Sequence, residues 1–167
     1  MRVSATTKMM TVVGLMVCAT TAMATPGTYI FADGIDGGSN GYPNLRASEV
    51  NSYSANVAEG QCGEIVVEKP FDKASPKYLA AAFNGTLLPR IQIFVREGSS
   101  EGEYDSVRLE LKDSIVTRIE TPIRNGETRE VLSLLPTELK MTFTEVDDRG
   151  RPLGNVETTV VCVKKVK

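Results

Sequence analysis

The chain has 167 residues, a length that favours a single domain with one hydrophobic core. It carries 19 basic and 21 acidic residues, a formal net charge of −2, which argues against a general nucleic-acid binder because such proteins need a basic surface. It contains no histidine, which excludes Ser-His and Cys-His catalysis and most zinc and transition-metal sites. The composition therefore predicts a non-enzymatic protein that uses no metal and no cofactor.

The first 24 residues have the layout of a secretory signal peptide. Arg2 and Lys8 precede an apolar run, the segment holds no acidic residue, and a small-x-small cleavage pattern ends at Ala24. The run is too short for a transmembrane helix, which needs about 20 apolar residues, so no stable membrane anchor is expected. Cleavage would leave one domain, residues 25–167, with 17 basic and 21 acidic residues and a net charge of −4. The alternative is a translation start at Met23.

Short strands are expected in the first half of the remaining chain. The first is predicted at 28–32, and the segment 33–44 after it is too rich in Gly, Asn and Asp for regular structure. Further strands are predicted at 48–57 and 62–68.

A single short helix is predicted at about residues 76–84. Ser75 is expected to cap its first turn, and Pro76 falls at the first helical position, where its missing N–H costs nothing. Gly85 fits a left-handed stop. The apolar residues of this segment recur at helical spacing and make one apolar face; they are Leu79, Ala82 and Phe83.

Clean two-residue alternation follows the helix. Phe94 and Val116 fall on the polar side of their strands, so they are candidates for a surface covered by a neighbouring molecule. Alternation with Gly-bearing turns predicts a mainly β fold, a compact antiparallel β-barrel or sandwich with one short helix. The expected strands are 90–96, 104–112, 114–120, 139–146 and 156–166.

Two cysteines, Cys62 and Cys162, remain once a leader containing Cys18 is removed. In an oxidising compartment they could form a disulfide that closes a long loop, which the chain-entropy model values at up to about 4–5 kcal/mol. The alternative is a pair of buried free thiols, because the sequence does not show whether the two Cβ atoms meet.

The helix segment "FDKASPKYLAAAFNG" resembles the helix motif of the Hcp family, the hemolysin-coregulated proteins of bacterial type VI secretion. The family's helix opens with Asp-Lys-x-Ser-Pro and ends at Gly. The residues that carry this motif here are Asp72, Lys73, Ser75, Pro76, Leu79, Phe83 and Gly85.

Four other segments are similar to the family's in the same order, so the resemblance spans about residues 27–155. They are "YIFADGIDGGS", "SEVNSYS", "YDSVRLELKDSIVTRIE" and "ELKMTFTEVDDRGRPLG". Three features depart from the family: Ala55-Asn56 stands where Trp-Gly is usual, the family's frequent histidines are missing, and the family's tube subunits, which assemble in the cytoplasm, normally carry no signal peptide.

The resemblance implies a flattened antiparallel β-barrel with the helix on its flank, where Leu79 and Phe83 would be buried against the barrel. It also implies a ring of six copies with a central channel, rings that stack into a tube, and no chemical step. The protein would then be a ring-forming structural and secreted protein of the type VI secretion system that carries effectors. Its partners would be further copies of itself and the spike, sheath or effector proteins of that system. The alternative is an exported domain of the same fold that binds a partner in the periplasm or outside the cell without a tube.

The two expected starts predict different locations. With the signal peptide, the protein is secreted or periplasmic. With a start at Met23, it is made in the cytoplasm and leaves the cell by type VI secretion.

Overall fold

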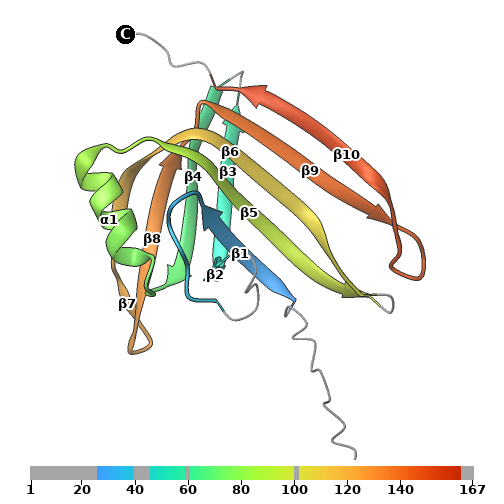
Figure 1. The fold of residues 1–167 in the computed structure, drawn as a ribbon, viewed down its shortest axis with the longest axis horizontal. Coiled ribbons are helices and arrows are strands. Elements are labelled where there is room, and N and C mark those ends of the chain that lie inside the picture. The colour runs from blue at the N-terminus through green and yellow to red at the C-terminus, as the bar shows by residue number, and fades with distance from the viewer. Residues whose placement is uncertain (1–25, 40–45, 59–60, 100–101, 163–167) are drawn as a thin grey trace, which may run out of the picture.

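The computed structural model describes residues 26–39, 46–58, 61–99 and 102–162 (Figure 1). The predicted signal peptide and its cleavage site at Ala24 lie outside the described residues. The described part is almost entirely antiparallel strand with one helix, so the predicted mainly β fold is confirmed. None of its helices is long and apolar enough to cross a membrane.

The elements follow one another in the order of their labels. They are β1 (Gly27–Ala32), β2 (Ser48–Val50), β3 (Ser52–Ala58), β4 (Gln61–Pro70), α1 (Ser75–Asn84), β5 (Leu88–Ser99), β6 (Gly102–Glu120), β7 (Ile123–Arg124), β8 (Glu127–Leu135), β9 (Glu138–Val146) and β10 (Pro152–Val161).

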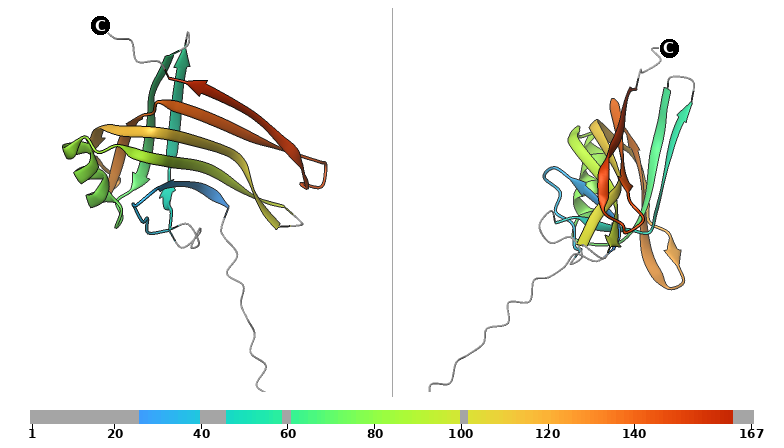
Figure 2. Two further views of the ribbon diagram at one scale, coloured as in Figure 1. Left: turned by 45° about the horizontal axis from the view of Figure 1, so that its top comes forward. Right: turned by 90° about the vertical axis from the view of Figure 1, so that its right-hand side faces the viewer.

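The strands form two layers that share β6. One layer has the order β2-β1-β5-β6-β9-β10, and the other has the order β6-β8-β4-β3. β8 and β9 lie end to end along β6, since Leu135 pairs with Ile115 and Glu138 pairs with Lys112. Within the described residues β10 and β3 do not pair with each other, so the sheet stays open instead of closing into a barrel (Figure 2).

The hydrophobic core lies between the two layers. Alternation explains it, because every second residue of a half-buried strand points to the same face. The core members are Ile30, Ile91, Ile93, Leu109 and Leu111 from the first layer, Ile65, Val67, Leu132 and Leu134 from the second, and Tyr78 and Ala81 from α1.

The strand Gly102–Glu120 replaces two strands that were predicted separately at 104–112 and 114–120. Asp113 has a positive φ of 44°, which turns the chain without ending the strand. Leu111 is buried before this point, and Val116 is buried after it, so the buried positions change parity. The prediction that Val116 is an exposed contact residue is therefore wrong.

Phe94 is also buried, contrary to its predicted exposure on the polar side of its strand. It packs with Tyr29 and Ala47 in a small second cluster on the outer face of the first layer. The rings of Tyr29 and Phe94 have their centroids 6.3 Å apart. Phe94 is thus covered by residues of its own chain and not by a neighbouring molecule, as had been expected.

Other boundaries differ from the predictions. The strand β8 was not predicted at all, and the segment 48–57 is divided into β2 and β3 at Asn51, whose N–H donates to the Glu68 carbonyl. The last strand starts at Pro152, four residues before its predicted start, and ends at Val161. The part of that prediction beyond residue 162 lies outside the described residues.

The helix forms at the predicted place but presents a different face. It begins at Ser75, its N-cap position is Ala74 with no side-chain cap, and Ser75 is buried inside the first turn, so the predicted capping role of Ser75 is wrong. Its C-cap is Gly85, in the predicted left-handed conformation with φ 61°. The buried helical residues are Ser75, Tyr78 and Ala81.

Leu79 and Phe83 are therefore not the residues that attach the helix. The side chain of Leu79 is 59% exposed and that of Phe83 is 89% exposed. The helix has apolar residues on two of its sides. The side with Tyr78 and Ala81 packs against the sheet, and the side with Leu79 and Phe83 faces outward. The prediction that Leu79 and Phe83 are buried is wrong for this physical reason.

Cys62 and Cys162 are joined by a disulfide in the structure, across a sequence separation of 100 residues. Their Cα atoms lie 5.1 Å apart. The bridge connects the start of β4, in the second layer, to the residue that follows β10, in the first layer. It therefore joins the two layers on the side where the sheet is open.

The corrected helix face gives a stability prediction. Tyr78→Ala should lower the free energy of unfolding by about 3–5 kcal/mol, because it removes a fully buried aromatic side chain and leaves a cavity. Leu79→Ala should change it by less than about 0.5 kcal/mol, because that side chain is exposed. Urea unfolding at concentrations that keep the chain monomeric measures both. A larger loss for Leu79→Ala than for Tyr78→Ala would contradict the observed face.

Candidate functional site

The described ranges contain no group of three or more His, Cys, Asp or Glu residues that could hold a metal ion. The features with functional content are instead a buried ionic network at the base of α1 and two exposed apolar surfaces. The network decides how α1 sits on the sheet, and α1 carries one of the surfaces.

The network is built around Lys69, whose side chain is 0% exposed. Its Nζ lies 2.9 Å from Asp72 Oδ1 and 2.9 Å from Glu130 Oε2, and it donates to Ser75 Oγ at 3.1 Å. It also donates to the Pro70 carbonyl at 2.9 Å. An isolated buried charge is very costly, so these acceptors are what allow a lysine to occupy this position.

Strand register brings the two buried charges together. Lys69 of β4 and Glu130 of β8 are directly paired in the antiparallel ladder. Lys69 shares its face with Ile65 and Val67, and Glu130 shares its face with Leu132 and Leu134, all of which are buried. Sequence reasoning missed both residues, although a lysine that continues an apolar alternation was a usable signal.

Ser75 and Asp72 extend the network into the start of the helix. The Ser75 hydroxyl donates to Glu130 Oε2 at 3.0 Å and accepts from the Asp72 N–H at 3.0 Å. Asp72 Oδ1 accepts from the Ala74 N–H at 3.0 Å, and its Oδ2 accepts from the Gly38 N–H at 3.0 Å. The motif residues Asp72 and Ser75 thus join the loop before β2, the helix and two strands.

The surroundings of Asp72 lower its pKa. Partial burial acts to raise the pKa, but hydrogen bonds from Lys69, Ser48 and the Gly38 backbone, together with the Lys69 charge, outweigh burial. The neighbouring Tyr78 shows the opposite effect, since complete burial, helped by the charges of Asp72 and Glu130, raises the pKa of its phenol. The Asp72 shift thus reflects its hydrogen bonds and the Lys69 charge, whereas the Tyr78 shift reflects exclusion from water.

The other motif residues of the segment point outward. Lys73 and Pro76 are exposed, and Leu79 and Phe83, four residues apart, form a pair on the exposed side of the helix. We refer to Leu79 and Phe83 as the helix surface. Because Leu79 and Phe83 are exposed side by side, they are a candidate contact with another protein.

The second apolar surface lies on the hairpin of β9 and β10. Phe143 is paired with Val107 of β6 on one side and with Val156 of β10 on the other, and Met141 is its neighbour on the same face. Phe143 is 49% exposed, and Met141 and Val156 are also exposed. We refer to Met141, Phe143 and Val156 as the hairpin surface, which continues the core face beyond the point where the second layer covers it.

The two surfaces lie on opposite sides of the molecule. Figure 1 shows α1 at one end of the long axis and the β9–β10 hairpin projecting toward the other end, and the rotated view in Figure 2 agrees. The same protein therefore offers two different apolar surfaces that cannot meet within one copy.

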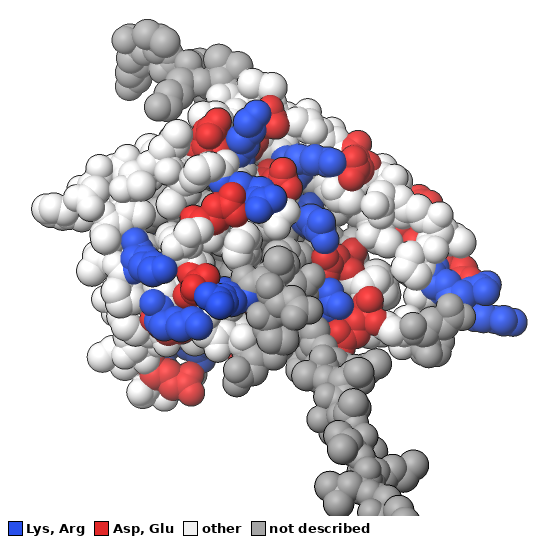
Figure 3. Space-filling model, in the orientation of Figure 1, with Lys and Arg blue, Asp and Glu red and all other residues white. Residues whose placement is uncertain are grey.

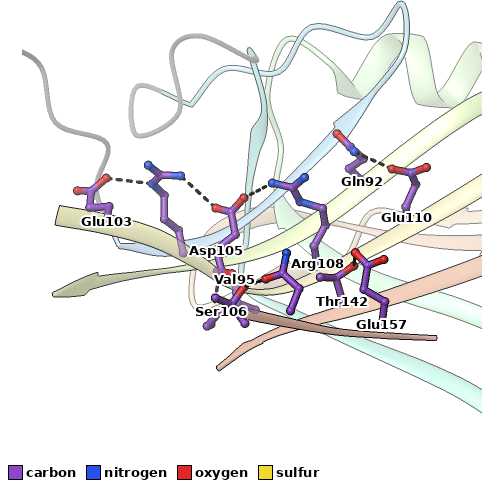
Figure 4. Close-up of polar contacts among 12 residues, drawn as sticks. Gln92, Val95, Glu103, Asp105, Ser106, Arg108, Glu110, Thr142 and Glu157 are labelled. Carbon is purple, nitrogen blue, oxygen red and sulfur yellow. Dashed lines mark hydrogen bonds and ion pairs between the residues drawn. The ribbon is translucent and has the colours of Figure 1, made fainter. Parts of the chain in front are cut away.

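The outer face of β5, β6, β9 and β10 is polar, with its charges paired. Figure 3 shows acidic and basic side chains interspersed, without an extended area of one sign. In the close-up of Figure 4, Asp105 lies between two arginines, and Arg96 also contacts Glu103 at 3.0 Å. Lys140 and Thr142 bond to Glu157 and lower the pKa of that carboxyl. On this face, these acidic and basic side chains therefore neutralise one another in ion pairs.

The low pKa of Asp72 predicts a pH dependence. A carboxyl whose pKa is lower in the folded than in the unfolded protein stabilises the fold above its unfolded value of about 3.9, and this contribution is lost as pH falls through the folded pKa. The unfolding free energy of the wild type should therefore fall steeply below about pH 4, and Asp72→Asn should flatten that fall. Denaturant titrations from pH 7 to pH 2, with exposed Lys73→Asn as the control, measure this. Parallel curves for wild type and Asp72→Asn would contradict it.

Comparisons with solved structures place this fold among type VI secretion proteins. A type VI secretion system effector from Yersinia pestis matches with a TM-score of 0.70 at 19% identity, over 80% of this chain and 98% of that chain. Hcp1 from Salmonella typhimurium matches with a TM-score of 0.70 at 19% identity, over 80% and 92%. The secreted protein Hcp3 from Pseudomonas aeruginosa matches with a TM-score of 0.69 at 19% identity, over 84% and 100%. At this identity the likeness concerns the fold.

The family comparison goes further than the fold. No curated protein matches the chain. The family model described as type VI secretion system effector, Hcp, matches residues 29–147, which is well over half of the chain. The chain therefore belongs to the Hcp family of type VI secretion system effectors.

Proposed function

We propose that the protein is a ring-forming subunit whose rings stack into a type VI secretion tube and carry effector proteins, without performing a chemical step. The observation that carries this proposal is the presence of two different apolar surfaces at opposite sides of one molecule, the helix surface and the hairpin surface. Membership of the Hcp family supports the same function.

Two different surfaces favour a head-to-tail contact. A two-fold dimer buries the same patch on both copies, whereas a contact between unlike patches leaves one of each patch free and so propagates. The addition of further copies ends only when the rotation between neighbouring copies closes a ring. The family resemblance implies that six copies close it. In this arrangement Leu79 and Phe83 of one copy cover Met141, Phe143 and Val156 of the next.

The polar outer face fits a channel wall through which proteins pass. Its acidic and basic side chains are paired with one another, so it has little net charge with which to retain a passing protein or a nucleic acid. Spike, sheath and effector proteins would be the partners of the assembled tube.

A second candidate function is an exported binding domain of the same fold that forms no tube. The disulfide between Cys62 and Cys162 favours it, because disulfides persist in oxidising compartments. The leader-like first 24 residues point the same way.

The N-terminus of the native protein separates the two locations. Export through a signal peptide predicts that the natively expressed protein begins at residue 25, after cleavage at Ala24. Intact mass and the cell fraction measure this together. A native species that begins at Met1 or Met23 and stays in the cytoplasm would contradict export by a signal peptide and favour assembly inside the cell.

A mixing experiment tests the ring. Phe83→Asp damages the helix surface and Phe143→Asp damages the hairpin surface, and each should give a monomer where the wild type gives closed rings, since losing a central aromatic contact costs about 2 kcal/mol or more per interface. A mixture of the two variants retains one intact pair of surfaces and should give a one-to-one dimer. Native mass spectrometry at micromolar concentration distinguishes these species.

Two controls add the same charge to the helix and to the hairpin, outside the two surfaces. Asn84→Asp lies next to Phe83, and Thr159→Asp lies on the other face of the hairpin, opposite Lys140. Both should still form rings. A wild type that is monomeric at every concentration would refute the ring, and rings from Phe83→Asp or Phe143→Asp would show that other surfaces make the contact.

A further inference from the structure

The C-terminal strand is an exposed edge strand of the first layer. Among the described residues β10 pairs with β9 alone, and nine of its ten residues are exposed. Because β9 is itself paired with β6, β10 is attached to the sheet through the single ladder that it forms with β9. A second attachment at the end of β10 would therefore restrict how far this strand can separate from β9.

The disulfide is placed to do this. Cys162 follows β10 directly, and its partner Cys62 lies near the start of β4, where it pairs with Val57 of the edge strand β3. Figures 1 and 2 show that the end of β10 lies beside the ends of β3 and β4, at the side where the sheet is open. Besides the bridge, the Cys162 N–H donates to the Thr137 carbonyl at 2.8 Å.

The bridge supplies what a closed barrel would supply through hydrogen bonds. In a closed barrel, β10 and β3 would be joined by a ladder, but the described residues of these two strands are not paired. Both cysteines are only partly buried and pack against the edge of the main core. One covalent bond therefore joins the free ends of the two layers at a position that a reagent in solution can approach.

We propose that Cys62 and Cys162 form a redox clasp that controls the C-terminal hairpin. As a disulfide, the pair fixes the end of β10 against the second layer and holds the hairpin surface in shape. As two thiols, the pair releases β10, and the hairpin opens locally. The effect on assembly rests on the proposed ring function, whereas the effect on the hairpin does not.

The chemistry of the clasp is thiol–disulfide exchange. One cysteine thiolate attacks the sulfur of an external disulfide, such as glutathione disulfide or the active-site disulfide of an oxidoreductase, and forms a mixed disulfide. The thiolate of the other cysteine then displaces the external thiol and forms the Cys62–Cys162 bond. The protein loses two protons and two electrons, and the external disulfide is reduced to two thiols.

The direction of the switch follows from the compartment. In a reducing cytoplasm both residues are thiols and β10 is held only by β9, whereas in an oxidising compartment the clasp closes. Because the bridge spans 100 residues, it also removes many open conformations from the unfolded and partly unfolded chain. The hairpin surface is thus best ordered after the protein has left a reducing compartment.

Hydrogen exchange of the full chain tests the clasp. The oxidised protein, the same protein after reduction with a phosphine, and the Cys62→Ala/Cys162→Ala double variant are compared by mass spectrometry. We expect protection of the β10 amides to fall about tenfold on reduction and in the double variant, while β5 and β6 amides, in the centre of the sheet, keep their protection. The double variant should not respond to the reductant. Native mass spectrometry of the same three samples reports the fraction in rings.

The outcomes separate the clasp from the ring. Equal β10 protection in all three samples, or two alkylatable thiols in protein treated with glutathione disulfide, would overturn the clasp. Loosened β10 with an unchanged ring fraction would overturn its control of assembly. A protein that forms no rings in either redox state, but whose β10 loosens on reduction, would refute the ring function and support the clasp.

Discussion

The ion pair between Lys69 and Glu130 is the interaction on which the rest of the structure depends. It lies in the ladder between β4 and β8, with both side chains almost completely buried. Removing one partner of such a pair leaves an uncompensated buried charge, at a cost of about 3–5 kcal/mol. Because Ser75 and Asp72 complete the bonding of Lys69, the pair also determines where the helix begins. Its contribution is thus to specify one orientation of α1 on the sheet.

That orientation has consequences at the surface. With Ser75 directed at the buried pair, helical geometry turns Tyr78 and Ala81 toward the sheet and leaves Leu79 and Phe83 outside. The polar contacts of Ser75 at the start of the helix therefore determine that Leu79 and Phe83 lie on its exposed side. The second apolar surface arises differently, because β9 and β10 continue the core face past the end of the opposite layer. Two unrelated local causes give the two unlike surfaces that a head-to-tail assembly requires.

Much of the fold was predictable, since alternation in the strands Leu88–Ser99 and Glu138–Val146 and the Ser-Pro and Gly signals of the helix are local. The predictions that were wrong concerned residues whose burial depends on contacts with segments far away in the sequence. The helix face was wrong because Leu79 and Phe83 satisfy helical periodicity as well as Tyr78 and Ala81 do, and only the sheet chooses between them. Phe94 was misassigned because Ala47, far away in sequence, covers it. Lys69 and Glu130 were missed because the predicted strand 62–68 ended before Lys69 and the strand that holds Glu130 was not predicted, so their pairing could not be seen.

Oxidative footprinting of the assembled protein tests the central claim that the helix surface and the hairpin surface bury each other between copies. Hydroxyl radicals label exposed aromatic and sulfur-containing side chains, so Phe83, Met141 and Phe143 report directly. The account predicts strong labelling of all three in dilute monomer and protection of all three in the ring, with exposed Phe71 labelled alike in both. Equal labelling of Phe83 and Phe143 in ring and monomer would contradict it.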